Sequence, residues 1–204
     1  MTAPNEYLLM TEPKEVIDRH IGRYDTAIHY LKDLLGLRKG TWYDAGCGIG
    51  YGTKKMPGTW NIGFDINEKA IRQANVTSTV PGTVFHNMGM SDIETLLRPG
   101  ILRAILCIHS YEHMHPQEQY HALCTFWRML EPGGALWLCC PVVEEFDAFA
   151  NPYHISTPTI EGIKSGLKLA GFITDAAVQV LGTTDYKATS GEMETEVRIL
   201  ARKL

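Results

Sequence analysis

The sequence predicts an α/β fold: a doubly wound, mostly parallel seven-stranded sheet with a C-terminal antiparallel hairpin and an N-terminal helical extension. Three observations support this prediction. Strand-like and helix-like patterns alternate along most of the chain. The runs Ile101–Ile108 and Ala135–Cys140 are almost continuously apolar, as expected for strands buried on both faces. The last two β-like runs, Phe172–Leu181 and Glu194–Ala201, flank a polar loop and predict the hairpin.

Length and composition narrow the class of protein. The 204 residues suggest one domain, 1–204, in which residues 1–40 form a helical cap. A net charge of −4 and a pI near 6.1 argue against a nucleic-acid-binding surface. No apolar run approaches the roughly 20 residues of a membrane-spanning helix. The five cysteines form no Cys-x-x-Cys pair and Met1–Glu6 resembles no signal peptide, so we expect a reduced, cytoplasmic protein.

The first half of the chain gives three strands in order. Pro13–Leu35 carries apolar residues at helical steps and is closed near Gly36. Thr41–Tyr43 begins the first strand, and Pro57-Gly58 keeps the helix that follows short. The next predicted elements are a second strand at Trp60–Asp65, Asn67 as N-cap of a helix through Ala74, a third strand at Thr83–Asn87 and a short helix at Ser91–Leu97.

The second half alternates in the same way. After the fourth strand, helical spacing returns from Tyr120 to Leu130, and Pro132–Gly134 is expected to make a turn before the fifth strand. A further helical stripe runs from Ile160 to Ala170. We expect Ser156 or Thr157 to cap this helix, with Pro158 at its first position.

A glycine-rich stretch follows the first strand. Asp44–Gly52 reads Asp-Ala-Gly-Cys-Gly-Ile-Gly-Tyr-Gly. Its glycines allow a tight turn to pass close beneath a ligand, because no Cβ blocks the approach. Asp44 adds a carboxylate at the end of the strand, where open α/β sheets bind ligands. Asp65 lies about 20 residues further on, at the distance typical of an acid that binds ribose hydroxyls.

Four stretches in this order resemble the class I S-adenosylmethionine-dependent methyltransferases, particularly their broad small-molecule group. They are Asp44–Gly50, Asp65, Cys107–His113 (Cys-Ile-His-Ser-Tyr-Glu-His) and Leu130–Gly134 (Leu-Glu-Pro-Gly-Gly). The resemblance implies a Rossmann-like methyltransferase fold and S-adenosyl-L-methionine as cofactor. A predicted helix with His20, Arg23 and Tyr24, followed by Gly-Tyr-Gly-Thr, is also similar to bacterial members that act on sugars or other small metabolites.

The resemblance also implies cofactor-binding residues: Asp44, Gly46, Cys47, Gly48, Tyr51, Asp65, Ile66, Gly89, Met90 and Ile108. One position departs from the family pattern. Many members place an Asp after the third strand to hold the adenine amino group, but this chain has Met88-Gly89-Met90-Ser91. We therefore expect the backbone at Gly89 and Met90 to bind the adenine edge, with Met90 packed on the ring. Asp92 is interpreted as a helix-start acid.

The end of the fourth strand is the first candidate for the chemistry. His109, Glu112 and His113 would share one face if this segment is helical. His113 is a candidate general base because histidine titrates near neutrality. The three residues also resemble the Glu-x-x-Glu-His of some ubiquinone-pathway O-methyltransferases, which leaves a transition-metal site as an alternative, although we assign no metal. A purely structural role in packing is the third possibility.

The loop after the fifth strand is the second candidate. His154 lies where the family places substrate-facing loops, and we expect it to act in catalysis or substrate binding. The acids Glu144, Glu145 and Asp147 are more typical of a solvated loop. Cys139 and Cys140 are interpreted as core residues rather than nucleophiles.

These features favour methyl transfer to a small-molecule acceptor, more often at oxygen than at nitrogen or carbon. Two alternatives stay open: a methyltransferase of nucleic acid or protein, and a catalytically inactive S-adenosylmethionine-binding partner subunit. The oligomeric state is not predicted.

Overall fold

The computed structural model describes residues 14–143, 154–173, 175–187 and 193–204. It contains one seven-stranded sheet in the order β3-β2-β1-β4-β5-β7-β6. The first five strands are parallel, and β7 runs antiparallel to both β5 and β6, which confirms the predicted sheet and hairpin. The strands are β1 (Thr41–Ala45), β2 (Trp60–Asp65), β3 (Thr83–Asn87), β4 (Leu102–Ile108), β5 (Leu130–Val142), β6 (Val178–Lys187) and β7 (Met193–Arg202).

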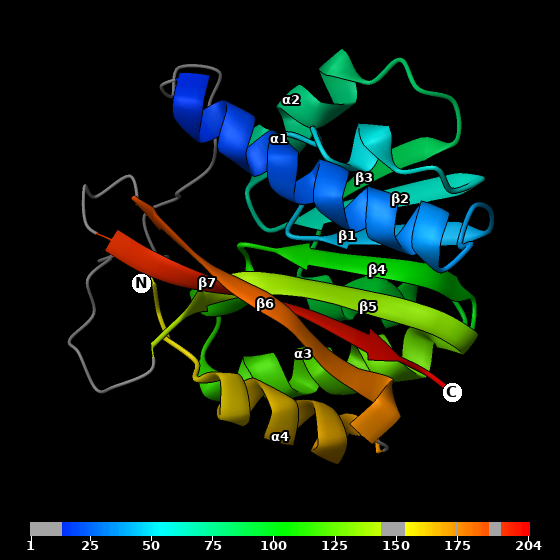
Figure 1. Ribbon diagram of the computed structural model, residues 1–204. Coiled ribbons are helices and arrows are strands. Elements are labelled where there is room, and N and C mark those ends of the chain that lie inside the picture. The colour runs from blue at the N-terminus through cyan, green and yellow to red at the C-terminus, as the bar shows by residue number, and fades with distance from the viewer. Residues whose placement is uncertain (1–13, 144–153, 174, 188–192) are drawn as a thin grey trace.

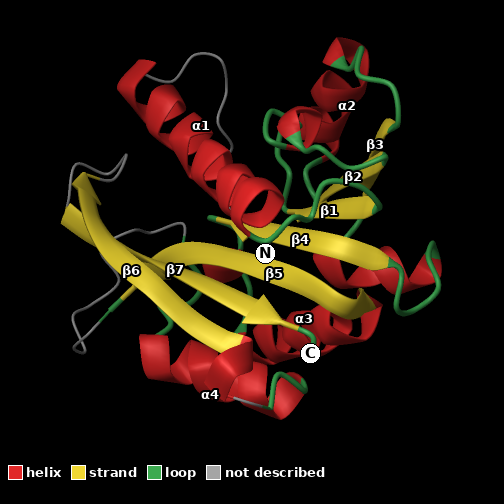
Figure 2. Cartoon of the chain, turned by 45° about the vertical axis from the view of Figure 1, so that its right-hand side comes forward, coloured by secondary structure: helices red, strands yellow, loops and turns green. Residues whose placement is uncertain are grey.

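Helices cover both faces of the sheet. Figures 1 and 2 show α1 and α2 on one face and α3 and α4 on the other. The helices are α1 (Lys14–His29), continued by a π-helical turn at Tyr30–Leu34, α2 (Glu68–Thr77), α3 (Pro116–Met129) and α4 (Ile160–Ala170). Short 3₁₀ turns lie at Thr53–Lys55, Met90–Thr95, Tyr111–His113 and Asp175–Ala177.

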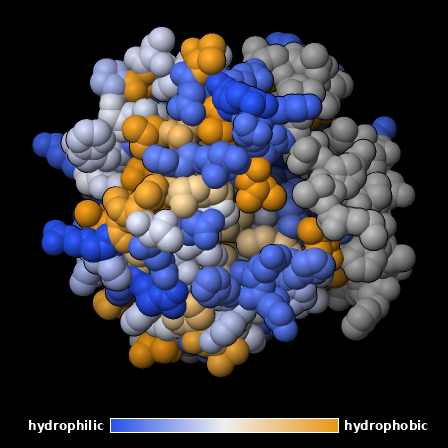
Figure 3. All heavy atoms as spheres, turned by 180° about the vertical axis from the view of Figure 1, so that it is seen from behind, coloured by the Kyte–Doolittle hydropathy of each residue, from blue (hydrophilic) through white to orange (hydrophobic). Residues whose placement is uncertain are grey.

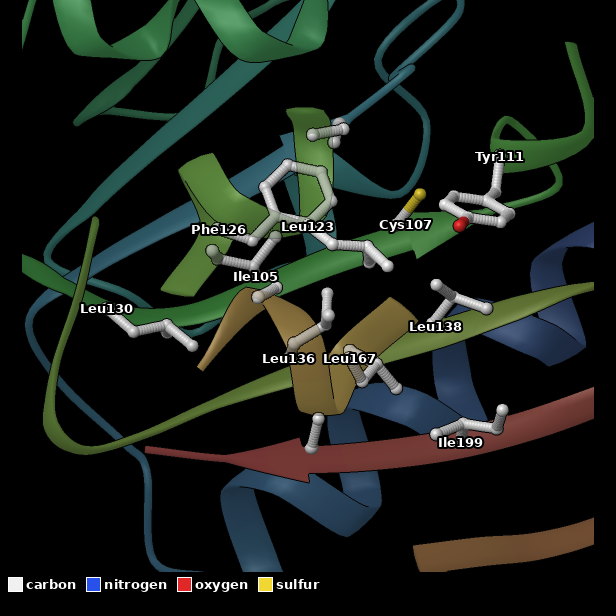
Figure 4. Close-up of a cluster of buried hydrophobic side chains, with 14 of the residues drawn as sticks. Ile105, Cys107, Tyr111, Leu123, Phe126, Leu130, Leu136, Leu138, Leu167 and Ile199 are labelled. Carbon is white, nitrogen blue, oxygen red and sulfur yellow. The ribbon is translucent and has the colours of Figure 1, made fainter. Parts of the chain in front are cut away.

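Three apolar clusters hold the helices to the sheet, and the smallest packs α2 against β3 through Ile71, Ala74 and Phe85. Between the sheet and α3 and α4, Ile105 and Leu136 pack with Phe126 and Leu167 (Figure 4). A second cluster lies beneath α1 and includes Trp42 and Trp137, both buried. On the face shown in Figure 3, hydrophobic side chains are scattered among hydrophilic ones. Among the described residues, no helix is long and apolar enough to cross a membrane.

Local capping follows the sequence at α2 and at the turn after β3. The Asn67 side chain accepts hydrogen bonds from the amides of Lys69 and Ala70, as expected for an N-cap. The Asp92 carboxylate accepts from the Gly89 amide at 2.8 Å, which confirms Asp92 as a helix-start acid. The helix after the glycine-rich turn is only the 3₁₀ turn Thr53–Lys55, as short as Pro57 predicts.

The first strand of the hairpin is β6 at Val178–Lys187 rather than the predicted Phe172–Leu181, because a 3₁₀ turn occupies Asp175–Ala177 and pairing with β7 continues to Lys187. Two further predicted boundaries were wrong. Pro132–Gly134 is an irregularity within β5, not a turn before it: pairing moves from Leu130 opposite Leu102 to Ala135 opposite Ala104. The Gly133 amide donates to the Lys203 carbonyl at 2.6 Å, so β7 and the C-terminus hold this bulge in the sheet.

The second correction concerns the start of α4. Thr159 is the N-cap, and its hydroxyl accepts from the Gly162 amide at 3.0 Å. Ser156 and Thr157 precede it because the Ile155 and Ser156 amides both donate to the Glu112 carbonyl. These bonds fasten the segment that follows His154 to the 3₁₀ turn at the end of β4.

Candidate functional site

The glycine-rich turn leaves open space above β1. Gly46, Gly48 and Gly50 have φ values of +83°, +52° and +74°, in the left-handed region that favours glycine. A Cβ at Gly46 would lie 2.3 Å from the Cβ of Ser110, so the turn packs directly against the residues after β4. A Cβ at Gly48 would meet nothing within 4 Å. Gly48 therefore faces space in which a ligand can approach the backbone.

Asp44 connects this turn to α1. It is fully buried, and its two carboxylate oxygens accept from the Tyr24 hydroxyl at 3.0 Å and the Thr53 hydroxyl at 2.6 Å. Burial raises the pKa of Asp44 to about 7, although both hydroxyl donors act in the opposite direction. Within the described structure, Asp44 shapes the turn, and its contact with the cofactor stays a prediction.

Asp65 lies at the end of β2 beside the same turn. Its oxygens accept from the Gly48 and Asn67 amides, each at 2.8 Å. A carboxylate has about four acceptor sites, so two such bonds leave capacity for the ribose hydroxyls of S-adenosylmethionine. The neighbouring Ile66 is 77% exposed, an apolar side chain that a bound adenosine can cover. Asp65, Ile66 and the open space at Gly48 fit a nucleoside.

The remaining predicted cofactor residues differ in accessibility. Cys47 and Ile108 are buried, whereas Tyr51 is exposed. The Gly89 amide is already bonded to Asp92, and the Met90 carbonyl accepts from the Tyr43 hydroxyl at 2.8 Å. Of the adenine contacts predicted for this stretch, the half-buried Met90 side chain has the fewest competing bonds.

His109 follows β4 with a strained backbone. Among the residues that the structure describes, it alone combines a side chain with a positive φ, +49°. Its Nε2 lies 3.0 Å from a carboxylate oxygen of Glu196 on β7, and its Nδ1 lies 3.5 Å from Glu112. The ring also meets Tyr186 edge to face at 5.6 Å. The imidazole is thus held between two carboxylates.

Glu196 is held on its other side by α1. Arg23 contacts the same Glu196 oxygen at 2.6 Å, and both side chains are about nine-tenths buried. Burial raises the pKa of Glu196, but the His109 hydrogen bond and the Arg23 charge outweigh it and lower the pKa to about 2. Glu196 is therefore an ionised partner of two donors.

His113 and His154 form a separate pair. Their ring centroids are 5.4 Å apart, and Glu112 completes a group whose ligand-type atoms lie within 4.8 Å of one another. The Glu112 carboxylate is fully buried, and neither oxygen has a hydrogen-bond donor among the described residues. A carboxylate with two imidazoles can share a proton or hold a divalent transition metal. A second such group consists of His109, Cys139 and Glu196.

These contacts correct the expected arrangement after β4. His109, Glu112 and His113 do not act as one face, because His109 turns toward Glu196 while His113 lies against His154. Cys139 and Cys140 are buried in the core, as predicted, and burial raises the pKa of both thiols. Glu144, Glu145 and Asp147 lie outside the described residues.

Sequence reasoning missed Glu196 and Tyr186. The available signal was the alternation of side chains between the two faces of a strand. Glu196 is an acid on one face of β7, and the apolar Val197 and Ile199 lie on the other. An acid at that position requires a partner from elsewhere in the chain, but the sequence alone does not identify the partner as Arg23 on α1.

Solved structures with low sequence identity share this fold. The YcgJ protein of Bacillus subtilis has a TM-score of 0.69 at 11% identity, covering 86% of this chain and 99% of its own. An S-adenosylmethionine-dependent methyltransferase from Archaeoglobus fulgidus gives 0.62 at 15%, covering 93% and 100%. Geranyl diphosphate C-methyltransferase from Streptomyces coelicolor gives 0.67 at 14%, covering 100% and 91%.

A search of the curated proteins gave no match. Residues 43–138 match the family model described as a methyltransferase domain, and this range contains the glycine-rich turn, Asp65 and the His109–His113 segment. This match over residues 43–138 and the shared fold support the resemblance to the class I S-adenosylmethionine-dependent methyltransferases, a family that implies S-adenosylmethionine as cofactor.

Proposed function

We propose that residues 1–204 act as one domain, capped by its N-terminal helix, that transfers a methyl group to an oxygen atom of a small-molecule acceptor. The observation that carries this proposal is the pairing of His113 and His154, 5.4 Å apart, beside the buried Glu112. Methyl transfer to a hydroxyl requires removal of its proton, and an imidazole with a pKa near neutrality suits that task.

The pair lies next to the predicted cofactor pocket. Burial raises the pKa of Asp65, whereas its hydrogen bonds from the Asn67 and Gly48 amides and the nearby His113 act in the opposite direction. The effect of His113 requires it to lie close to the acid expected to hold the ribose. S-adenosylmethionine supplies an electrophilic methyl group on a sulfonium. The acceptor oxygen bonds to that carbon as the carbon–sulfur bond breaks, and its proton passes to an imidazole nitrogen of His113 or His154.

The test separates cofactor binding from turnover. Titration calorimetry with S-adenosylhomocysteine establishes binding, and labelled S-adenosylmethionine is then incubated with panels of phenols, sugars and organic acids. For the accepted substrate, His154→Ala and His113→Ala are each expected to lower kcat by about 100-fold or more and to leave cofactor binding unchanged. His121→Ala is the matched control, because His121 is exposed on α3.

Other outcomes would identify the alternatives. Unchanged turnover in both variants would remove the histidine pair from the chemistry. Cofactor binding without transfer to any panel would favour an inactive partner subunit, and transfer only to RNA, DNA or protein would replace the small-molecule acceptor.

A further inference from the structure

A pocket of about 460 Å³ lies between α1 and the exposed face of β5, β7 and β6. Cys139 and Glu196 line it, and both contact His109: the Cys139 carbonyl accepts from the His109 amide at 2.8 Å, and the Glu196 carboxylate holds the ring. One wall of the pocket is therefore in contact with His109, the residue that follows β4. Its volume suits a small organic molecule.

The pocket is lined by more arginines than acids. Arg19, Arg23 and Arg198 face Asp185 and Glu196. Arg23 forms the buried ion pair with Glu196. Arg19 donates to the carbonyl of Lys187, and Arg198 donates to the hydroxyl of Thr184, so both bond to neutral oxygens. Within the described ranges, neither has a carboxylate at salt-bridge distance.

These two guanidinium groups retain unused donors. Arginine offers five N–H donors in a planar fork that matches carboxylate and phosphate oxygens. In the described structure, the Nε of Arg198 is buried without a hydrogen-bond partner. Arg19 and Arg23 also lie over the Tyr186 ring, at 5.2 and 4.8 Å from its centroid, which restricts their orientation. The pocket thus presents positive charge that the protein itself leaves uncompensated.

Gly22 supplies independent evidence that this pocket is kept open for a ligand. It lies in the middle of α1, where glycine lowers helix stability relative to alanine, and it lines the pocket. A Cβ built at Gly22 meets nothing within 4 Å, so packing does not require glycine at this position. The missing side chain enlarges the pocket instead.

We propose that this pocket binds the acceptor through an oxyanion, a carboxylate or a phosphate, held by Arg19 and Arg198. The role as acceptor site rests on the proposed function, whereas the binding of the anion does not. The acceptor is then a small organic acid or phosphate ester.

The first experiment measures binding of simple probes by titration calorimetry and ligand-observed NMR. Benzoate, phenyl phosphate and inorganic phosphate are compared with the neutral benzamide and benzyl alcohol. The two aromatic anions are expected to bind at least tenfold more tightly than the neutral probes, and their relative affinities distinguish carboxylate from phosphate ester. Binding of inorganic phosphate alone would overturn the proposal of an organic acceptor.

Variants locate the site. Arg19→Gln and Arg198→Gln should each weaken binding of the preferred anion by about tenfold. Arg72→Gln is the control, since Arg72 is paired with Glu68 on the surface of α2 and should have no effect. Equal binding of neutral and anionic probes, or equal binding by all three variants, would refute the proposal.

Two substitutions at Gly22 distinguish the effect of filling the pocket from the effect of misfolding. Gly22→Ala should raise Tm by roughly 2 to 4 °C, because alanine favours the helix. Gly22→Leu should remain folded, as judged by circular dichroism, and lose at least tenfold in anion affinity. A folded Gly22→Leu protein that binds the anion as the wild type does would contradict the assignment.

Failure of this inference and of the proposed function are distinguishable. Anion binding without methyl transfer would retain the anion site and reject its acceptor role. Methyl transfer to a neutral acceptor without anion binding would retain the proposed function and reject the anion site.

Discussion

Two buried carboxylates contact neighbouring residues of α1, yet their pKa values shift in opposite directions. Asp44 accepts from Tyr24 and lies on the cofactor side, and burial raises its pKa to about 7. Glu196 pairs with Arg23, and His109 and Arg23 overcome the effect of burial and lower its pKa to about 2. The partners explain the difference: hydroxyl groups bond to Asp44, whereas a cation and an imidazole bond to Glu196.

The cofactor side and the pocket side of the molecule are stabilised by different kinds of contact. The cofactor side uses backbone amides, hydroxyls and glycines, most of which lie close together in sequence. The other side, around the pocket, depends on charges brought together from α1, β4 and β7. Three predictions examine this difference, beginning with the largest effect.

The first prediction concerns pH. An Asp44 pKa of about 7 in the folded protein, against an ordinary 3.8, means that the folded state holds this proton more tightly. The resulting stability is fully present below about pH 4 and is lost as the pH rises through 7. The full shift corresponds to a loss on the order of 4 kcal/mol. Urea unfolding from pH 4 to 8 measures it, and Asp44→Asn should flatten the curve. An equal slope in both proteins would show that Asp44 ionises normally.

The second prediction removes the cation from the other carboxylate. Arg23→Gln should lower the free energy of unfolding by about 3 kcal/mol at pH 7, because Glu196 loses its buried partner and keeps only His109. Arg19→Gln is the control on the same helix, because Arg19 bonds to a carbonyl rather than to an acid. Similar losses in the two variants would mean that the buried pair contributes no special stability.

The third prediction is the smallest. Tyr24→Phe keeps the ring and removes the donor to Asp44, at a cost of about 1 kcal/mol near pH 5 and more at pH 8, where Asp44 is ionised. Tyr43→Phe is the matched control, because its hydroxyl donates to the neutral Met90 carbonyl. Its loss should be the same at both pH values. A pH-independent loss for Tyr24→Phe would show that the strength of the Tyr24–Asp44 hydrogen bond does not change through ionisation of Asp44 between pH 5 and 8.

The sequence predicted the cofactor side better than the pocket side for a physical reason. The cofactor side depends on glycine spacing, the Asn67 cap and the acid at Asp65. These features act over a few residues or one strand–helix unit, so a short stretch of sequence is enough to predict them. The Arg23–Glu196 contact spans 173 positions and depends on how the hairpin adds to the sheet. The N-cap of α4 was misassigned for a related reason, since the Glu112 carbonyl holds residues 155 and 156 outside the helix.

Arg23 and Tyr24 are adjacent on α1. Arg23 fixes the helix to Glu196 on strand β7, and Tyr24 fixes it to Asp44 beside the glycine-rich turn. A shift of the helix that made room for a bulkier acceptor would lengthen the Arg23–Glu196 contact and strain the Tyr24–Asp44 bond together. With this pocket as the proposed acceptor site, acceptor preference would change most readily by substitution on the pocket side of an unmoved helix, at Arg19, Gly22 and Thr26. Evolution of new acceptors on this scaffold would proceed by substitution at these positions before any movement of α1.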